Sequence, residues 1–130
     1  MNITFIHQHF TTPQSGGALR SYYLATGLQK LGHSITVITT HNHPKKIIEI
    51  TEGVTVIYLP IKYHNHYGFL KRVYSFLVFV RKAFSVLKSL EKPDLLYSIS
   101  TPLTTGLIAI KAKRVLGIPY CFEVGDLWPE

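Results

Sequence analysis

The chain has 130 residues, 46% of them hydrophobic and 16% charged, which fits one globular domain and excludes a disordered chain. Its formal net charge is +7, and nine of its 14 basic residues lie between Lys45 and Lys92, so we expect an anionic partner near that region. The longest charge-free apolar run, residues 73–80, is far shorter than the roughly 20 residues that span a bilayer.

Strand and helix patterns alternate along the chain. The sequence predicts strands at residues 2–6, 34–40, 54–59, 95–99 and 118–124, and helices at residues 18–31, 68–91 and 102–116. Residues 41–53 are expected to form a polar, basic loop or a poorly formed extension. The alternation is typical of a doubly wound, mostly parallel α/β sheet of about five strands, in the order 3-2-1-4-5, with helices on both faces. The apolar setting of Cys121 in the last strand predicts a buried, unreactive thiol in a reducing compartment.

The long predicted helix, residues 68–91, combines an apolar stripe with basic residues. By helical spacing, the apolar stripe consists of positions 69, 73, 76, 77, 80, 84, 87 and 90. The basic residues of interest are Lys71, Arg72, Arg81 and Lys82. The stripe can simply pack on the sheet while the basic residues are solvated. Alternatively, the further apolar residues Leu70, Tyr74, Val78 and Phe79 indicate contact with an anionic membrane surface. Nucleic acid is not expected, because the aromatic residues form no open platform.

The loop after the first strand carries a glycine pair, Gly16 and Gly17, immediately before a predicted helix. Glycine lets the backbone approach a phosphate, and the first turn of a helix offers unpaired N–H groups. The dinucleotide spacing G-x-G-x-x-G is absent, and so is the G-K-[ST] sequence of a phosphate-binding P-loop. The pattern therefore leaves two interpretations open, an anion site or a tight turn.

Histidines form three H-x-H pairs, each of which follows a predicted strand. The pairs are His7 with His9, His41 with His43, and His64 with His66. Histidine is a common zinc ligand, but no cysteine or carboxylate stands at a convincing spacing beside them. We therefore predict no metal site and expect these histidines to be solvated or packed in loops.

Three stretches together resemble the retaining glycosyltransferases of family 4, which have the GT-B fold. They are the opening HQHFTTPQSGGALRSYYLATGLQKLGHSITVITT, the segment KPDLLYSISTPLTTGLIA, and the end IPYCFEVGDLWPE. The last stretch is similar to a subgroup that includes bacterial cell-surface polysaccharide enzymes. Gly125 departs from the pattern, because many relatives have arginine there. The likeness covers nearly the whole chain in order and implies a Rossmann-like N-terminal domain over residues 1–130.

The resemblance implies a sugar transfer, of hexosyltransferase type, from a nucleotide-sugar donor to a hydroxyl acceptor that is lipid-linked or a saccharide. Gly16, Gly17 and Arg20 would then approach the donor diphosphate, and Asp126 would be the catalytic candidate at the cleft. Lys71, Arg72, Arg81 and Lys82 would lie on the acceptor and membrane side. The resemblance implies no cofactor or metal, and a location in the cytoplasm at the inner face of the membrane.

The family also has a C-terminal nucleotide-sugar-binding domain, which residues 1–130 do not include, so the chain alone is expected to be inactive. Two other interpretations stay open. One is a stand-alone flavodoxin-like domain that binds a phosphate-bearing ligand without catalysis. The other is a structural half that works with a separate partner chain. A local role is also open for Asp126, as a turn cap before Trp128, and for Arg20, as an ordinary surface residue.

Overall fold

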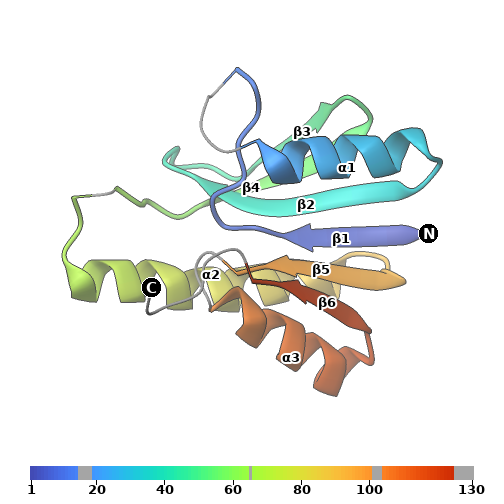
Figure 1. Cartoon of the computed structure of the whole chain (residues 1–130). Coiled ribbons are helices and arrows are strands. Elements are labelled where there is room, and N and C mark those ends of the chain that lie inside the picture. Colours follow the sequence, from blue (N-terminus) through green and yellow to red (C-terminus); the bar gives the residue numbers. More distant parts are fainter. Residues whose placement is uncertain (15–18, 65, 101–103, 125–130) are drawn as a thin grey trace.

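The fold is a six-stranded sheet with helices on both faces, seen in a computed structural model that describes residues 1–14, 19–64, 66–100 and 104–124 (Figure 1). Its elements are β1 (Asn2–Ile6), α1 (Arg20–Lys30), β2 (Ser34–His41), β3 (Ile47–Thr51), β4 (Val54–Pro60), α2 (Phe69–Ser89), β5 (Leu95–Ile99), α3 (Thr105–Leu116) and β6 (Tyr120–Glu123). The strand order is β3-β4-β2-β1-β5-β6, and only the pairing of β3 with β4 is antiparallel.

The five predicted strands are β1, β2, β4, β5 and β6, and their predicted order 3-2-1-4-5 is confirmed. The prediction of a loop over residues 41–53 is wrong in part, because β3 forms there as an additional edge strand. Three of its five residues are isoleucine, whose branched side chain favours strands. The turn into β4 consists of Glu52 and Gly53, with φ angles of 50° and 79°. Positive φ at both positions is typical of the type I′ turn that joins two antiparallel strands.

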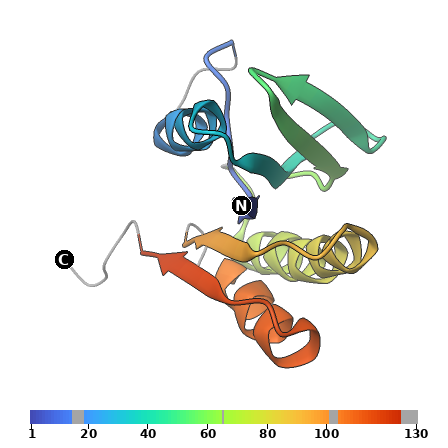
Figure 2. The ribbon, with the colours of Figure 1, turned by 90° about the vertical axis from the view of Figure 1, so that its right-hand side faces the viewer.

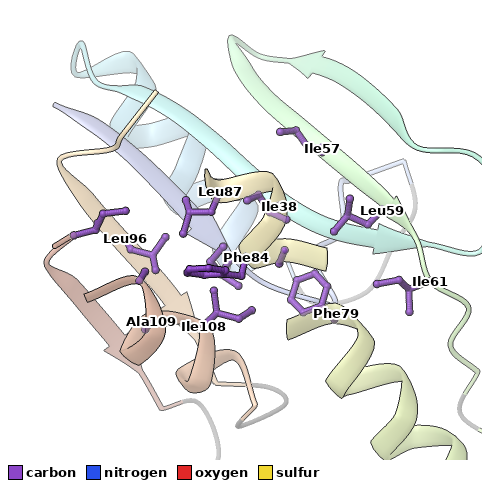
Figure 3. Packing of buried hydrophobic residues seen from close by; sticks show 14 residues of the cluster. Ile38, Ile57, Leu59, Ile61, Phe79, Phe84, Leu87, Leu96, Ile108 and Ala109 are labelled. Carbon is purple, nitrogen blue, oxygen red and sulfur yellow. The ribbon is translucent and has the colours of Figure 1, made fainter. Parts of the chain in front are cut away.

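Two hydrophobic cores lie on opposite faces of the sheet, as expected for a doubly wound fold. Figure 2 shows the helices on the two sides of the sheet. On one face α1 packs Tyr22 and Ala25 against strand residues that include Phe5 and Val37. On the other face α2 and α3 pack against the sheet through a larger cluster, which Figure 3 shows around Phe84. Strands buried on both faces need apolar side chains at successive positions, which explains the near-continuous apolar runs of the sequence.

Helix α2 is rotated relative to the predicted stripe. Its buried residues are Ser75, Phe79, Ala83, Phe84 and Leu87. Phe69 and Leu77, both on the predicted stripe, are 78% and 50% exposed, whereas Phe79 is fully buried. The N-terminal end of α2 extends past the edge of the sheet (Figure 1), and residues 69–72 are exposed. The small side chains of Ser75 and Ala83 let the rest of the helix approach its neighbours closely, and a hydrophobicity pattern does not register such positions.

The prediction of a buried Cys121 is wrong. The residue lies on β6, the outermost strand on its side of the described sheet, and it is exposed. An apolar sequence around a strand residue predicts burial only if a layer covers that face, and the neighbouring Tyr120 is also exposed. Within the described ranges, no helix combines the length and apolar character needed to cross a membrane.

The parallel register brings the carboxyl ends of five strands to one edge of the sheet. Ile6 at the end of β1 pairs with Ile38 on β2 and with Ser98 on β5, and Ile99 pairs with Glu123 on β6. On the other side of β2, His41 pairs with Pro60 at the end of β4. We call this the carboxyl edge. Loops that follow these strands meet there, and the overhanging start of α2 lies at the same end (Figure 1). In such sheets ligands bind at the carboxyl edge.

Candidate functional site

A polar cluster at the carboxyl edge joins three elements that are distant in the sequence. Glu123 ends β6, Tyr97 lies on β5, and Arg20 is the first residue of α1. Arg20 donates from Nη1 to one oxygen of the Glu123 carboxylate, and the Tyr97 hydroxyl donates to the other. We call Arg20, Glu123 and Tyr97 the carboxylate cluster.

The cluster holds Glu123 in its ionised form. The hydrogen bond from Arg20 lowers the pKa of Glu123 most. Burial raises this pKa, and the hydrogen bond from Tyr97 lowers it again. Burial and the Glu123 carboxylate together raise the pKa of Tyr97, so its phenol stays protonated and donates at neutral pH. The result is a fixed negative charge whose two oxygens are each oriented by a hydrogen-bond donor.

His7 stands beside the cluster, immediately after β1. Its Nδ1 and the hydroxyl of the buried Ser21, on α1, are 2.9 Å apart and share a hydrogen bond. Burial and the nearby His9 lower the pKa of His7 from 6.5 to about 4, although Glu123 acts in the opposite direction. The imidazole is therefore neutral at pH 7 and can both donate and accept a hydrogen bond. A neutral ring next to an ionised carboxylate suits the recognition of hydroxyl groups.

Gln8 fixes the start of the first loop. Its backbone carbonyl accepts hydrogen bonds from the hydroxyls of Thr39 and Thr40, each at 3.0 Å. Its side chain is 1% exposed and donates from Nε2 to Ser75 Oγ on α2 at 3.2 Å. No group of the described residues donates to its buried Oε1. The loop is thus tied to β2 on one side and to α2 on the other, which positions His7 and His9.

Two hollows flank this loop on the side of β2. A cavity of about 210 Å³ is lined by the loop from Gln8 to Thr11, by the end of β2 and by Tyr63. A larger one of about 540 Å³ lies between the loop and the β3–β4 hairpin, with Thr12, His43, Glu49 and Tyr58 among its walls. Polar walls that include an aromatic ring favour a saccharide over an apolar ligand, because a sugar presents hydroxyls and an apolar face.

The predicted donor-site residues are only partly described. Arg20 lies at the carboxyl edge as expected, but its charge is paired with Glu123. Gly16, Gly17 and Asp126 lie outside the described residues, and so does Trp128. Their assigned roles therefore stay predictions.

The basic residues singled out on the long helix all lie on α2. Lys71, Arg72 and Arg81 are exposed, and Lys82 is half-buried. Helix α2 contacts β2, β4 and α3, whereas the carboxylate cluster lies on α1, β5 and β6. These residues therefore form a surface separate from the carboxylate cluster.

The residues that sequence reasoning missed are Glu123, Tyr97 and Ser21, whereas His7 was considered only as a member of an H-x-H pair. Glu123 was visible as an acidic residue at the end of a strand, a position that faces the ligand edge of a parallel sheet. Its partners lie 103 and 26 residues away in the chain, so only the strand order brings them together.

The histidine pairs form ring contacts in the structure. The rings of His41 and His43 stack with centroids 5.6 Å apart, and those of His64 and His66 at 5.2 Å. His9 packs 4.8 Å from the Tyr63 ring. Within the described ranges, no three histidine, cysteine or acidic side chains come together as metal ligands would. The contacts fit the expectation of loop packing, and the absence of a metal site stays a prediction.

Comparisons with known proteins agree with the fold and name a family. The model of the glycosyl transferase 4-like domain matches residues 15–130. No curated protein matches the sequence. Sucrose-phosphate synthase from Thermosynechococcus elongatus is a similar structure, with a TM-score of 0.67 and 18% identity over 93% of this chain and 32% of that one.

Two further structures are similar at the same level of identity. A ugt transferase from Siraitia grosvenorii, solved in complex with UDP, has a TM-score of 0.57 at 18% identity. The match covers 93% of this chain and 27% of the transferase chain. The C-terminal domain of PF1911 hydrogenase from Pyrococcus furiosus has a TM-score of 0.66 at 18% identity, over 95% of this chain and 91% of that domain. This chain thus spans 32% of the length of the synthase and 27% of the length of the transferase.

At these identities the structural likeness shows the fold alone, a Rossmann-like α/β sheet. The family model covers most of the chain, from the first loop through the carboxylate cluster to residue 130. The chain therefore belongs to the glycosyl transferase 4-like domain family.

Proposed function

We propose that this domain forms the acceptor side of a retaining glycosyltransferase that moves a hexose from a nucleotide sugar to a hydroxyl acceptor. The observation that carries the proposal is the carboxylate cluster, which lies at the carboxyl edge of a domain of this family. The cluster and the neutral His7 offer oriented hydrogen-bond partners where a parallel sheet binds its ligand. The UDP bound to the Siraitia grosvenorii transferase supports a nucleotide-sugar donor.

The donor diphosphate would meet the start of α1. The backbone amides of Gly16 and Gly17 precede this helix, and its N-terminal end favours negative charge. The Arg20 guanidinium has more N–H donors than its contact with Glu123 uses, so it can bind a phosphate while the carboxylate holds its position. Asp126 follows β6 by three residues and is the proposed catalytic residue. No metal or organic cofactor takes part in this proposal.

The acceptor would be lipid-linked or a saccharide, as in the synthesis of cell-surface polysaccharides. The overhanging start of α2 supports a membrane-bound acceptor, because Leu70 and Tyr74 are 80% and 72% exposed there. Basic residues, among them Arg81, lie on the same helix. This arrangement fits a cytoplasmic enzyme held at the inner face of an anionic membrane. The domain's partner in catalysis would be a C-terminal domain that completes the donor site.

Replacing Arg20 by glutamine tests the donor site. We expect the chain to bind UDP weakly. Arg20→Gln should lower the affinity for UDP about tenfold, which is the effect of one lost charge-assisted hydrogen bond. Titration calorimetry with UDP measures this, with Lys30→Gln as control, since Lys30 is an exposed base at the other end of α1. Equal UDP affinity in wild type and Arg20→Gln would contradict the assignment of Arg20.

The same protein tests whether catalysis needs a second domain. Incubated with UDP-sugars, residues 1–130 alone should release no UDP, because the proposal puts the rest of the donor site on a second domain. Turnover by this chain would contradict that expectation. Tight binding of a phosphate ligand without any effect of Arg20→Gln would instead favour the flavodoxin-like alternative.

A further inference from the structure

A groove with cationic and apolar walls lies between α2 and the segment that leads into it from β4. Its volume is about 320 Å³, and its walls include Lys62, Lys71 and Lys82 together with Tyr67, Tyr74 and Val78. We call it the lysine groove. It lies on the same side of the sheet as the larger core, and neither the carboxylate cluster nor the first loop lines it.

The charge of the groove is uncompensated by its own walls. None of the groove's lining residues is acidic, and α2 contains neither aspartate nor glutamate over its whole length. The Lys71 ammonium lies 5.1 Å from the centroid of the Tyr67 ring, a cation–π contact that holds it at the wall. Lys82 is half-buried, and Lys62 is exposed at the rim. Three ammonium groups around one hollow favour a ligand with more than one negative charge, such as a phosphate monoester.

Apolar side chains continue from the groove onto the overhang of α2. Tyr74 lines the groove and is 72% exposed, and Phe69 and Leu70 lie about one turn earlier with 78% and 80% exposure. Large apolar side chains gathered at one protruding end are uncommon on a freely solvated surface. These apolar side chains lie beside the cationic groove. The arrangement fits an amphiphile, in which a charged head is joined to an apolar tail.

We propose that the lysine groove binds the phosphate headgroup of an anionic lipid, while Phe69, Leu70 and Tyr74 enter the adjoining layer of the bilayer. This inference rests on the membrane contact proposed above for α2, and it is independent of sugar transfer. It adds a specific headgroup site to a surface for which the sequence indicated only general contact with an anionic membrane. The lysines supply the phosphate contacts, and Tyr74 marks the path of the tail out of the groove.

The first experiment uses dihexanoyl phosphatidic acid below its micelle concentration, so that one lipid meets one protein. We expect binding in titration calorimetry, with amide NMR shifts at Tyr67, Tyr74 and Val78. The variant Lys62→Gln/Lys71→Gln/Lys82→Gln should bind about a hundredfold more weakly, the sum of three ammonium contacts. The matched control is Lys30→Gln/Lys45→Gln/Lys46→Gln, which removes the same charge from exposed lysines elsewhere and should change the affinity less than about twofold.

Two comparisons decide between a headgroup site and general attraction. Inorganic phosphate should bind more weakly than the short-chain lipid, and dihexanoyl phosphatidylcholine should not bind. If the control variant lost as much affinity as the groove variant, the proposal would be overturned. The same holds if the wild type bound inorganic phosphate as tightly as the short-chain lipid.

Vesicles separate failure of the groove from failure of membrane contact. Wild type should sediment with vesicles containing phosphatidic acid, and the groove variant should not. Binding by both proteins would overturn the groove and keep membrane contact, whereas binding by neither would overturn both. Neither result bears on the UDP titration, so the transferase proposal is tested separately.

Discussion

Replacing Phe79 by alanine is expected to lower the free energy of unfolding by about 3 to 5 kcal/mol. The ring is fully buried and belongs to the larger core, where α2 meets the sheet (Figure 3). Removing it deletes buried apolar area and leaves a cavity that the surrounding strands cannot fill. Chemical denaturation followed by circular dichroism measures the loss.

Phe69→Ala is the matched control for this prediction. It is the same substitution on the same helix, but Phe69 is 78% exposed and lies on the overhang. Its cost should stay below about 0.5 kcal/mol, as for most surface substitutions. The sequence stripe, which contained position 69 and not position 79, predicts the opposite ranking. A larger loss for Phe69→Ala than for Phe79→Ala would therefore contradict the rotation of α2 described here.

Acidification is expected to destabilise the protein as the pH falls from about 6.5 to about 4, because His7 must gain a proton in a buried position. The pKa of His7 is about 4 in the folded protein and has its ordinary value of 6.5 when exposed. Between these values the unfolded chain binds the proton and the folded chain does not, so stability is complete above pH 6.5 and declines below it. The full difference corresponds to about 3 kcal/mol.

Denaturation curves at several pH values measure this effect, with His7→Gln as the variant that cannot titrate. The wild type should lose more stability than His7→Gln between pH 7 and pH 5. Burial also lowers the pKa of His9, so His7→Gln should keep part of the pH dependence. The pKa of Glu123 is lowered in the folded protein, so its carboxylate stabilises the folded state at these pH values. This stabilisation is lost only at still lower pH, as the folded carboxylate gains its proton. Parallel curves for wild type and variant above pH 5 would contradict the role of His7.

Periodicity was enough to predict most of the fold. The central strands bury both faces and therefore read as apolar runs, so their number and order followed from alternation with helices. The edge strand β3 was missed because its side chains are largely exposed and mixed in character. The available signal was Gly53 immediately before β4, since glycine readily adopts the positive φ that a tight hairpin turn requires.

The site was less predictable, because it depends on contacts across the sheet. Strand order allowed the carboxyl edge to be expected. The structure has Arg20 there, bonded to Glu123, and its role toward a donor stays a prediction. Nothing in the sequence near Arg20 indicates that it forms an ion pair with Glu123, or that Ser21 forms a hydrogen bond with His7. The rotation of α2 was missed for a similar reason. Burial depends on what lies beneath each turn, and the overhang leaves Phe69 without a layer to cover it.

The Gln8–Ser75 hydrogen bond has a thermodynamic consequence for the two surfaces described above. Ser75 belongs to the wall of the lysine groove, and Gln8 directly follows His7 at the carboxylate cluster. A shift of α2 that accompanies occupation of the groove must therefore either carry the first loop with it or break a buried hydrogen bond. In that case the two surfaces would share a coupling free energy, which by linkage acts equally in both directions.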